Sequence, residues 1–200
     1  MGKQQLLLAS QSPRRKEILL QLGVNFRQID VNVEETPKSN ELPANYVCRL
    51  AEAKARAGLL LNPQSVVLGA DTIVVCDDQI LEKPQSEVHA KTMLRKLSGR
   101  SHEVLSAVCM VSAAECLVEL SVTQVQFVAL SDELIDRYWR TKEGLDKAGS
   151  YAIQGRAAAF VKSISGSYSG VVGLPIEKVV PMLAYYGIDI WLDSQPKGAC

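Results

Sequence analysis

A short apolar run near the start of the chain leads directly into a helix start signal with three cations in its first turn. Leu6–Ala9 has the length of a buried strand, and Ser12 followed by Pro13 is typical of an N-cap and a first helical position. Arg14–Lys16 then place positive charge where the helix dipole is already positive, at a cost of ~0.3–1 kcal/mol each. Free N–H groups at a helix start bind phosphate, so the strand–turn–helix pattern favours an anion site over a solvated basic turn.

The charge balance limits the classes of protein to which the chain can belong. Its 200 residues include 22 basic and 22 acidic side chains, which argues against a broad basic face for a nucleic acid polymer but allows a local anion pocket. No apolar run is long enough to cross a membrane, and no signal peptide is evident. The five cysteines are scattered without a C-x-x-C pair, so we expect no disulfide framework or zinc site and predict a soluble, cytoplasmic protein.

Hydrophobic periodicity predicts helices interspersed with isolated and paired strands. We expect helices over 13–22, 43–61, 87–98, 131–138 and 175–186, and strands over 6–9, 26–31, 66–75, 80–81, 103–111, 116–130 and 157–164. In the strand over 116–130, Val118, Leu120 and Val122 alternate with polar neighbours, which favours a sheet with one face in water. The pattern indicates an α/β layer fold on a mixed sheet. One domain is expected over residues 1–192, followed by a flexible tail at 193–200.

Asp71 is the most anomalous residue in these predicted elements. It interrupts the apolar strand over 66–75, where an aspartate is disfavoured and burial of its charge is costly. Such a carboxylate has to be paired, neutralised or bound to metal. Gly69 and Ala70 leave space beside it for a ligand to approach. The alternatives to a functional role are a structural salt bridge or a strand end in solvent.

Lys54 is the second anomaly, because it falls on the apolar face of a predicted helix. Helical spacing directs it inward, whereas Glu52 and Arg56 are expected to pair on the outer face. An inward lysine either extends along its stem to the surface or reaches a carboxylate or a ligand phosphate. The apolar stripe that it shares consists of Val47, Leu50, Ala57 and Leu61.

Three other positions carry weaker signals. Lys83 follows a short strand at a sheet end, where an ordinary loop lysine is an equal alternative. Glu34 and Glu35 form an acidic pair in a loop; they are either simply solvated, or one of them helps Asp71 to hold a hard cation such as Mg²⁺. Gln154 lies between closely spaced glycines, and its amide could both donate to and accept from the edge of a base.

Several familiar catalytic patterns are absent from the sequence. The chain has neither the G-x-x-x-x-G-K-[ST] phosphate loop nor G-x-G-x-x-G, and its Gly166–Gly170 segment has tyrosine at the position of a nucleophile. Its two histidines, His89 and His102, are both expected at the surface. Acid–base chemistry would therefore depend on carboxylates or lysines.

Six short motifs, taken together, resemble the Maf family of nucleoside triphosphate pyrophosphatases over almost the whole chain. They are Ser10-Gln11-Ser12-Pro13-Arg14-Arg15-Lys16-Glu17, Gly69-Ala70-Asp71-Thr72, Glu82-Lys83-Pro84, Leu145-Asp146-Lys147-Ala148-Gly149, Ile153-Gln154-Gly155 and Val172-Gly173-Leu174-Pro175. The resemblance implies an α/β fold similar to inosine triphosphatase, with an elongated mixed β-sheet flanked by helices and a cleft between two lobes. It also implies a homodimer, and hydrolysis of a nucleoside triphosphate to the monophosphate and pyrophosphate with a divalent metal cation.

The same resemblance implies a role for each matching residue. Asp71 would be the base toward water, and Glu35 rather than Glu34 would share the cation, Mg²⁺, Mn²⁺ or a similar ion, with Asp71. Phosphates would be bound by Ser10, Ser12, Arg15, Lys54 and Lys83. Small departures from the family pattern occur at Ser150 and over 156–158, where glycine is common, and they leave this set intact.

Base selection in the family depends on three positions, which are Arg14, Thr72 and Gln154 in this chain. This trio resembles the group that acts on dTTP and UTP. The sister group, which prefers 7-methyl-GTP, has tryptophan, glutamine and glutamate there, and these suit a cationic methylated guanine. Arginine and glutamine instead suit a neutral pyrimidine with carbonyl oxygens and one ring N–H. A non-catalytic nucleotide-binding regulator of cell division is a further alternative, disfavoured because Asp71 would only repel a bound triphosphate.

Overall fold

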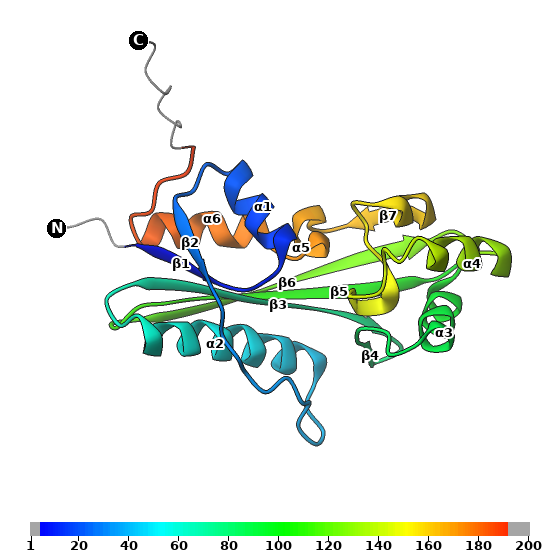
Figure 1. Ribbon diagram of the computed structural model, residues 1–200, viewed down its shortest axis with the longest axis horizontal. Coiled ribbons are helices and arrows are strands. Elements are labelled where there is room, and N and C mark those ends of the chain that lie inside the picture. Colours follow the sequence, from blue (N-terminus) through cyan, green and yellow to red (C-terminus); the bar gives the residue numbers. More distant parts are fainter. Residues whose placement is uncertain (1–4, 192–200) are drawn as a thin grey trace, which may run out of the picture.

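A long mixed sheet of seven strands runs through the molecule (Figure 1). The computed structural model describes residues 5–191, so the tail predicted at 193–200 lies outside the described residues. The strand order is β2-β1-β3-β5-β6-β7, with β4 paired to β3 off this path. β1 is parallel to β2 and β3, and the remaining pairs are antiparallel. The strands are β1 (Leu6–Ala9), β2 (Phe26–Ile29), β3 (Val66–Cys76), β4 (Gln79–Leu81), β5 (Ser101–Val111), β6 (Cys116–Phe127) and β7 (Val161–Ser165).

Helices cover both faces of this sheet and one of its ends. In Figure 1, α2 lies alone on one face, α1, α5 and α6 lie on the other, and α3 and α4 pack together at the far end. The helices are α1 (Pro13–Gln21), α2 (Pro43–Leu61), α3 (Glu87–Leu97), α4 (Asp132–Arg140), α5 (Tyr168–Val172) and α6 (Ile176–Tyr185), with 3₁₀ turns η1 (Ala148–Ser150) and η2 (Arg156–Phe160). The expected α/β fold, an elongated mixed sheet flanked by helices, is confirmed. Within residues 5–191, no helix combines the length and the apolar character needed to span a membrane.

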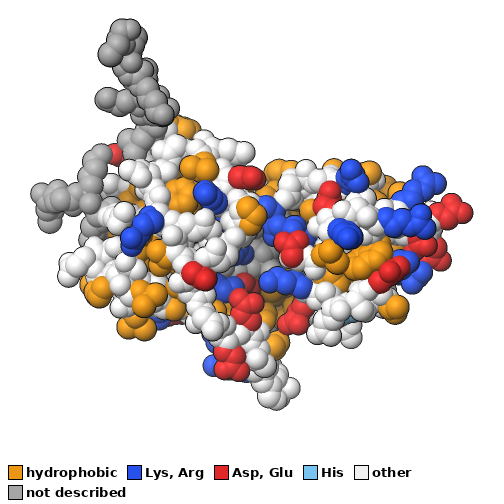
Figure 2. Space-filling view, in the orientation of Figure 1, with side chains coloured by type: hydrophobic (Ala, Val, Ile, Leu, Met, Phe, Trp, Pro, Cys, Tyr) orange, Lys and Arg blue, Asp and Glu red, His pale blue; other side chains and the backbone are white. Residues whose placement is uncertain are grey.

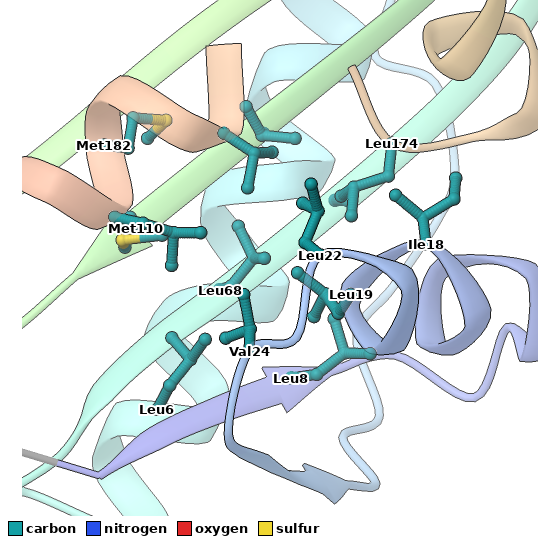
Figure 3. Close-up of a cluster of buried hydrophobic side chains, with 14 of the residues drawn as sticks. Leu6, Leu8, Ile18, Leu19, Leu22, Val24, Leu68, Met110, Leu174 and Met182 are labelled. Carbon is teal, nitrogen blue, oxygen red and sulfur yellow. The ribbon is translucent and has the colours of Figure 1, made fainter. Parts of the chain in front are cut away.

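Because helices lie on both of its faces, the sheet has an apolar core on each side. Figure 3 shows the core under α1 and α6, where Leu8 of β1 and Leu68 of β3 meet Leu19 of α1 and Met182 of α6. Burial on both faces explains why β1 and most of β3 read as continuous apolar runs. Ser10, directly after β1, and Asp71, within β3, are therefore held at fixed places next to this core.

α2 packs unusually close to the sheet because β3 has a glycine beneath it. A Cβ on Gly69 would lie 2.3 Å from the carbonyl oxygen of Ala51, so only glycine allows this approach. The helix begins and ends where predicted, but its buried face is shifted from the expected stripe. Leu61, the last residue of the helix, is 67% exposed. The face that packs consists of Tyr46, Val47, Leu50, Ala51, Ala55 and Gly58.

Two expectations about the second half of the chain are wrong. The strand predicted over 157–164 begins only at Val161, because residues 156–160 form a 3₁₀ turn. Residues 168–172, which lie outside the predicted helices, form α5. In β6, Ser121 and Thr123 are buried beneath α5 and its flanking residues, on the same face as the buried Val125 and Phe127. Val118 and Val122, on the other face, are 38% and 48% exposed, which agrees with the expected sheet with one face in water.

His102 is also not at the surface. It is 3% exposed, and its Nε2 lies 2.8 Å from the hydroxyl of Tyr151. Its ring packs edge-on against Phe127, 4.9 Å between centroids. The four described cysteines are free, and Cys109 and Cys116 have their sulfurs 3.5 Å apart. Burial raises the pKa of the Cys109 thiol, which disfavours its thiolate form.

Candidate active site

The residues singled out from the sequence line one cavity, which lies between the two ends of the molecule. Its volume is about 730 Å³, with β1 and the start of α1 on one side and the loops around Lys83 and Asp146 on the other. Figure 2 shows acidic and basic side chains gathered around a hollow near the middle of the face in view. The expected cleft between two lobes is therefore present. It is lined by Ser10, Ser12, Arg14, Arg15, Glu35, Lys54, Asp71, Thr72, Lys83 and Gln154.

At the centre of the cavity wall, one lysine joins two carboxylates. Asp71 is 9% exposed within β3, so its charge needs a partner. Lys54 Nζ lies 2.7 Å from Asp71 Oδ1 and 2.6 Å from Glu35 Oε1. The Lys54 side chain is 12% exposed, so it does not extend to bulk solvent. Its inward direction is confirmed, and Glu52 and Arg56 pair outside it as predicted.

The loop that carries Glu35 is tied to α2. The Tyr46 hydroxyl donates to the Glu35 carbonyl oxygen at 2.6 Å. Burial, the largest cause, raises the pKa of Tyr46 to about 12, so this hydroxyl keeps its proton. Arg49 pairs with Glu41 at 2.6 Å and donates to the carbonyl oxygen of Thr36 at 3.1 Å. These contacts hold the Glu35 side chain over Lys54.

Positive charge around Glu35 favours its ionised form. Partial burial raises the pKa of Glu35, but the hydrogen bond from Lys54, together with the charges of Lys54, Lys83 and Arg15, outweighs that effect. The pKa of Glu35 is therefore below its usual value. Glu34 is not among the residues that line the cavity, so the geometry favours Glu35 of the two acids.

The start of α1 contributes hydroxyl groups and a guanidinium. Ser12 caps the helix by accepting from the Arg15 N–H, and the Ser10 hydroxyl accepts from Arg15 Nη1 at 3.1 Å. Arg15 Nε donates to the Gly173 carbonyl oxygen at 2.8 Å, and Nη2 donates to Thr72 Oγ1 at 3.3 Å. Burial lowers the pKa of Arg15, and the nearby Asp71 charge opposes that effect. The guanidinium is therefore fixed as a cation beside Asp71.

A chain of hydroxyl groups connects Arg15 to α5. Ser106 Oγ donates to the Gly170 carbonyl oxygen at 2.6 Å and lies 2.9 Å from Thr72 Oγ1. Since Ser106 has used its proton, Thr72 donates to Ser106 and accepts from Arg15. The donor and the acceptor of each hydrogen bond in this chain are therefore defined. The sequence carried a signal for Ser106, a polar residue inside an apolar strand, but this signal was missed.

Arg14 spans the cavity entrance. Its Nε donates to the Val172 carbonyl oxygen at 3.2 Å, and its Nη1 lies 3.9 Å from Asp146 Oδ2 on the opposite wall. Asp146 also pairs with Lys147. Neither residue was assigned a role from the sequence, although both belong to a motif that supports the resemblance. The side chain of Arg14 thereby links the end of α5 to the loop that carries Asp146.

Lys83 and Gln154 lie at the exposed rim of the cavity. Lys83 follows β4, and its charge reaches Glu35. Gln154 belongs to the loop between η1 and η2. The two loops meet where Gly149, in a left-handed conformation at φ 65°, donates its N–H to the Glu82 carbonyl oxygen at 3.2 Å. This contact places the backbone of both loops at one end of the cavity.

The donor set fits a hard divalent cation that is shared with a phosphate ligand. Glu35 and Asp71 direct carboxylate oxygens toward one positive centre, Lys54. Within the described residues, no group of three or more His, Cys, Asp or Glu side chains could enclose a metal. Mg²⁺ commonly uses one or two carboxylates and completes its shell with water and substrate phosphates. The two carboxylates therefore suit a cation that binds with a polyphosphate.

Comparison with known proteins agrees with this geometry. A dTTP/UTP pyrophosphatase of Shewanella sp. (strain MR-7) is 50% identical over 191 residues, which cover 92% of this chain and 98% of that protein. Another, of Symbiobacterium thermophilum, is 50% identical over 188 residues, 94% and 97% of the two chains. A HAM1 protein from Coxiella burnetii, 14% identical, has a similar fold with a TM-score of 0.50 over 91% of this chain and 99% of that one. Residues 5–186 match the family described as Maf-like protein, and the chain belongs to the Maf family.

Proposed function

We propose that this chain is a nucleoside triphosphate pyrophosphatase that hydrolyses dTTP and UTP to the monophosphate and pyrophosphate. One observation carries the proposal: the buried Asp71 faces a cavity in which Lys54, Arg15 and Lys83 supply positive charge. Two relatives of this chain, each 50% identical, are dTTP/UTP pyrophosphatases, which supports the same substrates.

The reaction is an in-line displacement at the α-phosphorus. Water attacks this atom, a bond forms between its oxygen and phosphorus, and the bond to the α,β-bridging oxygen breaks, so that pyrophosphate leaves with the bonding electrons. Asp71 accepts the water proton. Arg15 and Lys83, together with Lys54, offset the charge of the triphosphate, and the Ser10 and Ser12 hydroxyls complete the phosphate contacts.

A divalent cation would be held by Glu35 and Asp71. When bound, it supplies neutralisation of the phosphate charge and polarisation of the phosphorus centre. The chain's own residues prepare this arrangement, because Lys54 keeps the two carboxylates together, and Tyr46 fixes the loop of Glu35. The homodimer and the cytoplasmic location stay predictions.

Base selection is proposed for Arg14, Thr72 and Gln154. Arg14 and Gln154 lie at the rim of the cavity, where they can meet the carbonyl oxygens and the ring N–H of a pyrimidine. Thr72 contributes differently in this structure, because its hydroxyl is engaged by Arg15 and Ser106. A substrate panel with Arg14→Trp and Gln154→Glu separates this assignment from the 7-methyl-GTP activity of the sister group: the double variant should shift preference toward 7-methyl-GTP.

The test of the reaction is pyrophosphate release from dTTP, UTP, CTP, GTP and 7-methyl-GTP, with Mg²⁺ or Mn²⁺ and with a chelator. Asp71→Asn is expected to lower kcat on dTTP by at least about a hundredfold. Asp78→Asn, in the exposed turn between β3 and β4, is the matched control. In ¹⁸O-labelled water, the label should enter the monophosphate. Label in pyrophosphate, or binding of nucleotide without turnover, would contradict the proposal; the latter supports a regulator.

A further inference from the structure

We propose that Glu143 and Tyr138 are positioning residues for base recognition, which act by fixing the backbone of the loop that carries Gln154. The inference rests on the proposed function, because it takes Gln154 as a reader of the base. Neither residue lines the cavity, and neither belongs to the motifs that support the family resemblance. Their contacts nevertheless converge on the segment over 152–157.

Tyr138 holds the loop on the side before Gln154. Its hydroxyl accepts the N–H of Ala152 at 3.1 Å and donates to Glu143 Oε1 at 3.1 Å. Tyr138 is 4% exposed in α4, and its ring packs edge-on against Phe160, 5.0 Å between centroids. Burial raises the pKa of Tyr138. The hydroxyl therefore keeps its proton and stays a donor to Glu143.

Glu143 holds the loop on the side after Gln154. Its Oε2 accepts the N–H of Arg156 at 3.1 Å, and its Oε1 accepts the N–H of Ala157 at 3.4 Å. Hydrogen bonds to a carboxylate are stronger than those between neutral groups. Tyr138 and Glu143 together therefore accept hydrogen bonds from backbone N–H groups on both sides of Gln154. These belong to Ala152, Arg156 and Ala157.

Glycine 155 makes the close approach of the carboxylate possible. A Cβ on Gly155 would lie 2.4 Å from Glu143 Oε1 and 2.6 Å from Oε2. Any other side chain would displace Glu143 or the loop. Gly155 also closes the turn, because its N–H donates to the Ala152 carbonyl oxygen at 3.0 Å. The turn over 152–155 thus presents Gln154 from a backbone that is fixed at both ends.

A rigid backbone matters here because Gln154 itself is exposed at the cavity rim. The loop sets the position from which its amide group reaches a base, and a mobile loop would add a backbone ordering cost to the rotamer freedom that glutamine loses on binding. A loop that is held before the ligand arrives reduces the ordering cost of binding. Weakening this support should therefore raise KM and reduce the preference for one base over another. It should leave kcat, which depends on Asp71, nearly unchanged.

The test compares Glu143→Gln and Tyr138→Phe with Glu133→Gln, an exposed carboxylate in α4 that serves as the control. We expect KM for dTTP to rise about five- to twentyfold in the first two variants, with kcat within about twofold of the wild type. The preference for dTTP over 7-methyl-GTP, measured as the ratio of kcat/KM values, should fall by a similar factor. The control should match the wild type in each quantity.

Hydrogen–deuterium exchange supplies a readout that does not depend on activity. The amides of 152–157 should exchange at least about tenfold faster in Glu143→Gln and Tyr138→Phe, whereas those of β3 keep their protection. Unchanged KM and unchanged exchange would overturn the proposal. So would a loss of protection across the whole chain together with equal losses in kcat and stability, since that result indicates a purely structural role. A wild-type protein without turnover refutes the proposed function, while the exchange comparison still decides whether the loop is held by this pair.

Discussion

Lys54 Nζ lies 2.7 Å from Asp71 Oδ1, so a helix residue and a strand residue meet in the wall of the cavity. The same ammonium contacts Glu35 at 2.6 Å. Two carboxylates that would otherwise repel each other are therefore held together by one cation. This arrangement serves two purposes: it satisfies the buried charge of Asp71, and it keeps both acids available for a ligand cation.

Replacing Lys54 with methionine tests this arrangement. Methionine has a similar length without the charge, so Glu35 and Asp71 lose their common partner and repel each other. Without divalent ions the variant should melt at a lower temperature than the wild type, and Mg²⁺ should restore more stability to it than to the wild type. Thermal unfolding with a Mg²⁺ titration measures both effects. KM for dTTP should rise at least tenfold.

Lys91→Met is the matched control, because Lys91 also joins two carboxylates, Glu87 at 2.7 Å and Asp136 at 2.6 Å, but away from the cavity. If Mg²⁺ restores stability equally in both variants, the carboxylates at the cavity have no special affinity for a cation, and the prediction is wrong.

Ser106→Ala should weaken phosphate binding, although Ser106 does not line the cavity. The change leaves the Gly170 carbonyl oxygen without its donor and the Thr72 hydroxyl without its acceptor, and an unsatisfied buried group costs ~1–3 kcal/mol of unfolding free energy. Since Thr72 holds Arg15, we expect a severalfold rise in KM for dTTP. Ser101→Ala, exposed at the start of the same strand, is the control. Steady-state kinetics measure KM, and urea unfolding measures the free energy of unfolding. An unchanged KM would contradict the prediction, because it would show that Gly173 and Ser10 hold Arg15 in place without Thr72.

Local patterns predicted the central part of the site. Helical spacing alone placed Lys54 on the buried side of α2, and Pro43 marked the start of that helix. The cost of burying a charge singled out Asp71 in β3. Both predictions depend on a residue's own neighbours in the sequence, which is the information that periodicity carries.

The features that the sequence did not predict concern contacts between distant segments. Alternation in β6 shows which residues share a face, but it does not show which face is covered. Ser121 and Thr123 are buried because Glu177 and Ser167 supply their hydrogen-bond partners. His102 is buried for a similar reason: its partner Tyr151 is 49 residues away in the chain. At the start of the 3₁₀ turn over 156–160, the N–H groups of Arg156 and Ala157 likewise donate to the Glu143 carboxylate, a contact that no local pattern indicates.

Burial of His102 predicts a loss of stability in acid. Burial lowers the pKa of His102 to about 4, below the usual 6.5. Between these values the unfolded chain binds more protons than the folded one, so the contribution is fully present above pH 6.5 and is lost as the pH falls toward 4. Between pH 7.5 and 4.5 it should amount to about 2–3 kcal/mol. Urea unfolding across this range should show a slope that His102→Gln reduces. His89→Gln, in α3, should keep the wild-type slope; an equal slope in wild type and His102→Gln would contradict the assignment.

Gly69→Ala should separate α2 from β3 and thereby disturb the contact between Lys54 and Asp71. The added Cβ would lie 2.3 Å from the Ala51 carbonyl oxygen and 2.5 Å from the Ala55 backbone nitrogen, so backbone atoms have to move. Overpacking of this kind costs ~1–3 kcal/mol or more, and the shift of α2 moves Lys54 away from Asp71. We expect a lower melting temperature and a fall in kcat/KM of at least tenfold. Because the clash involves the backbone, adding Ala55→Gly should not restore either quantity. Full recovery in that double variant would mean that only the Ala55 methyl group is in the way, and that the spacing between helix and strand does not set the position of Lys54.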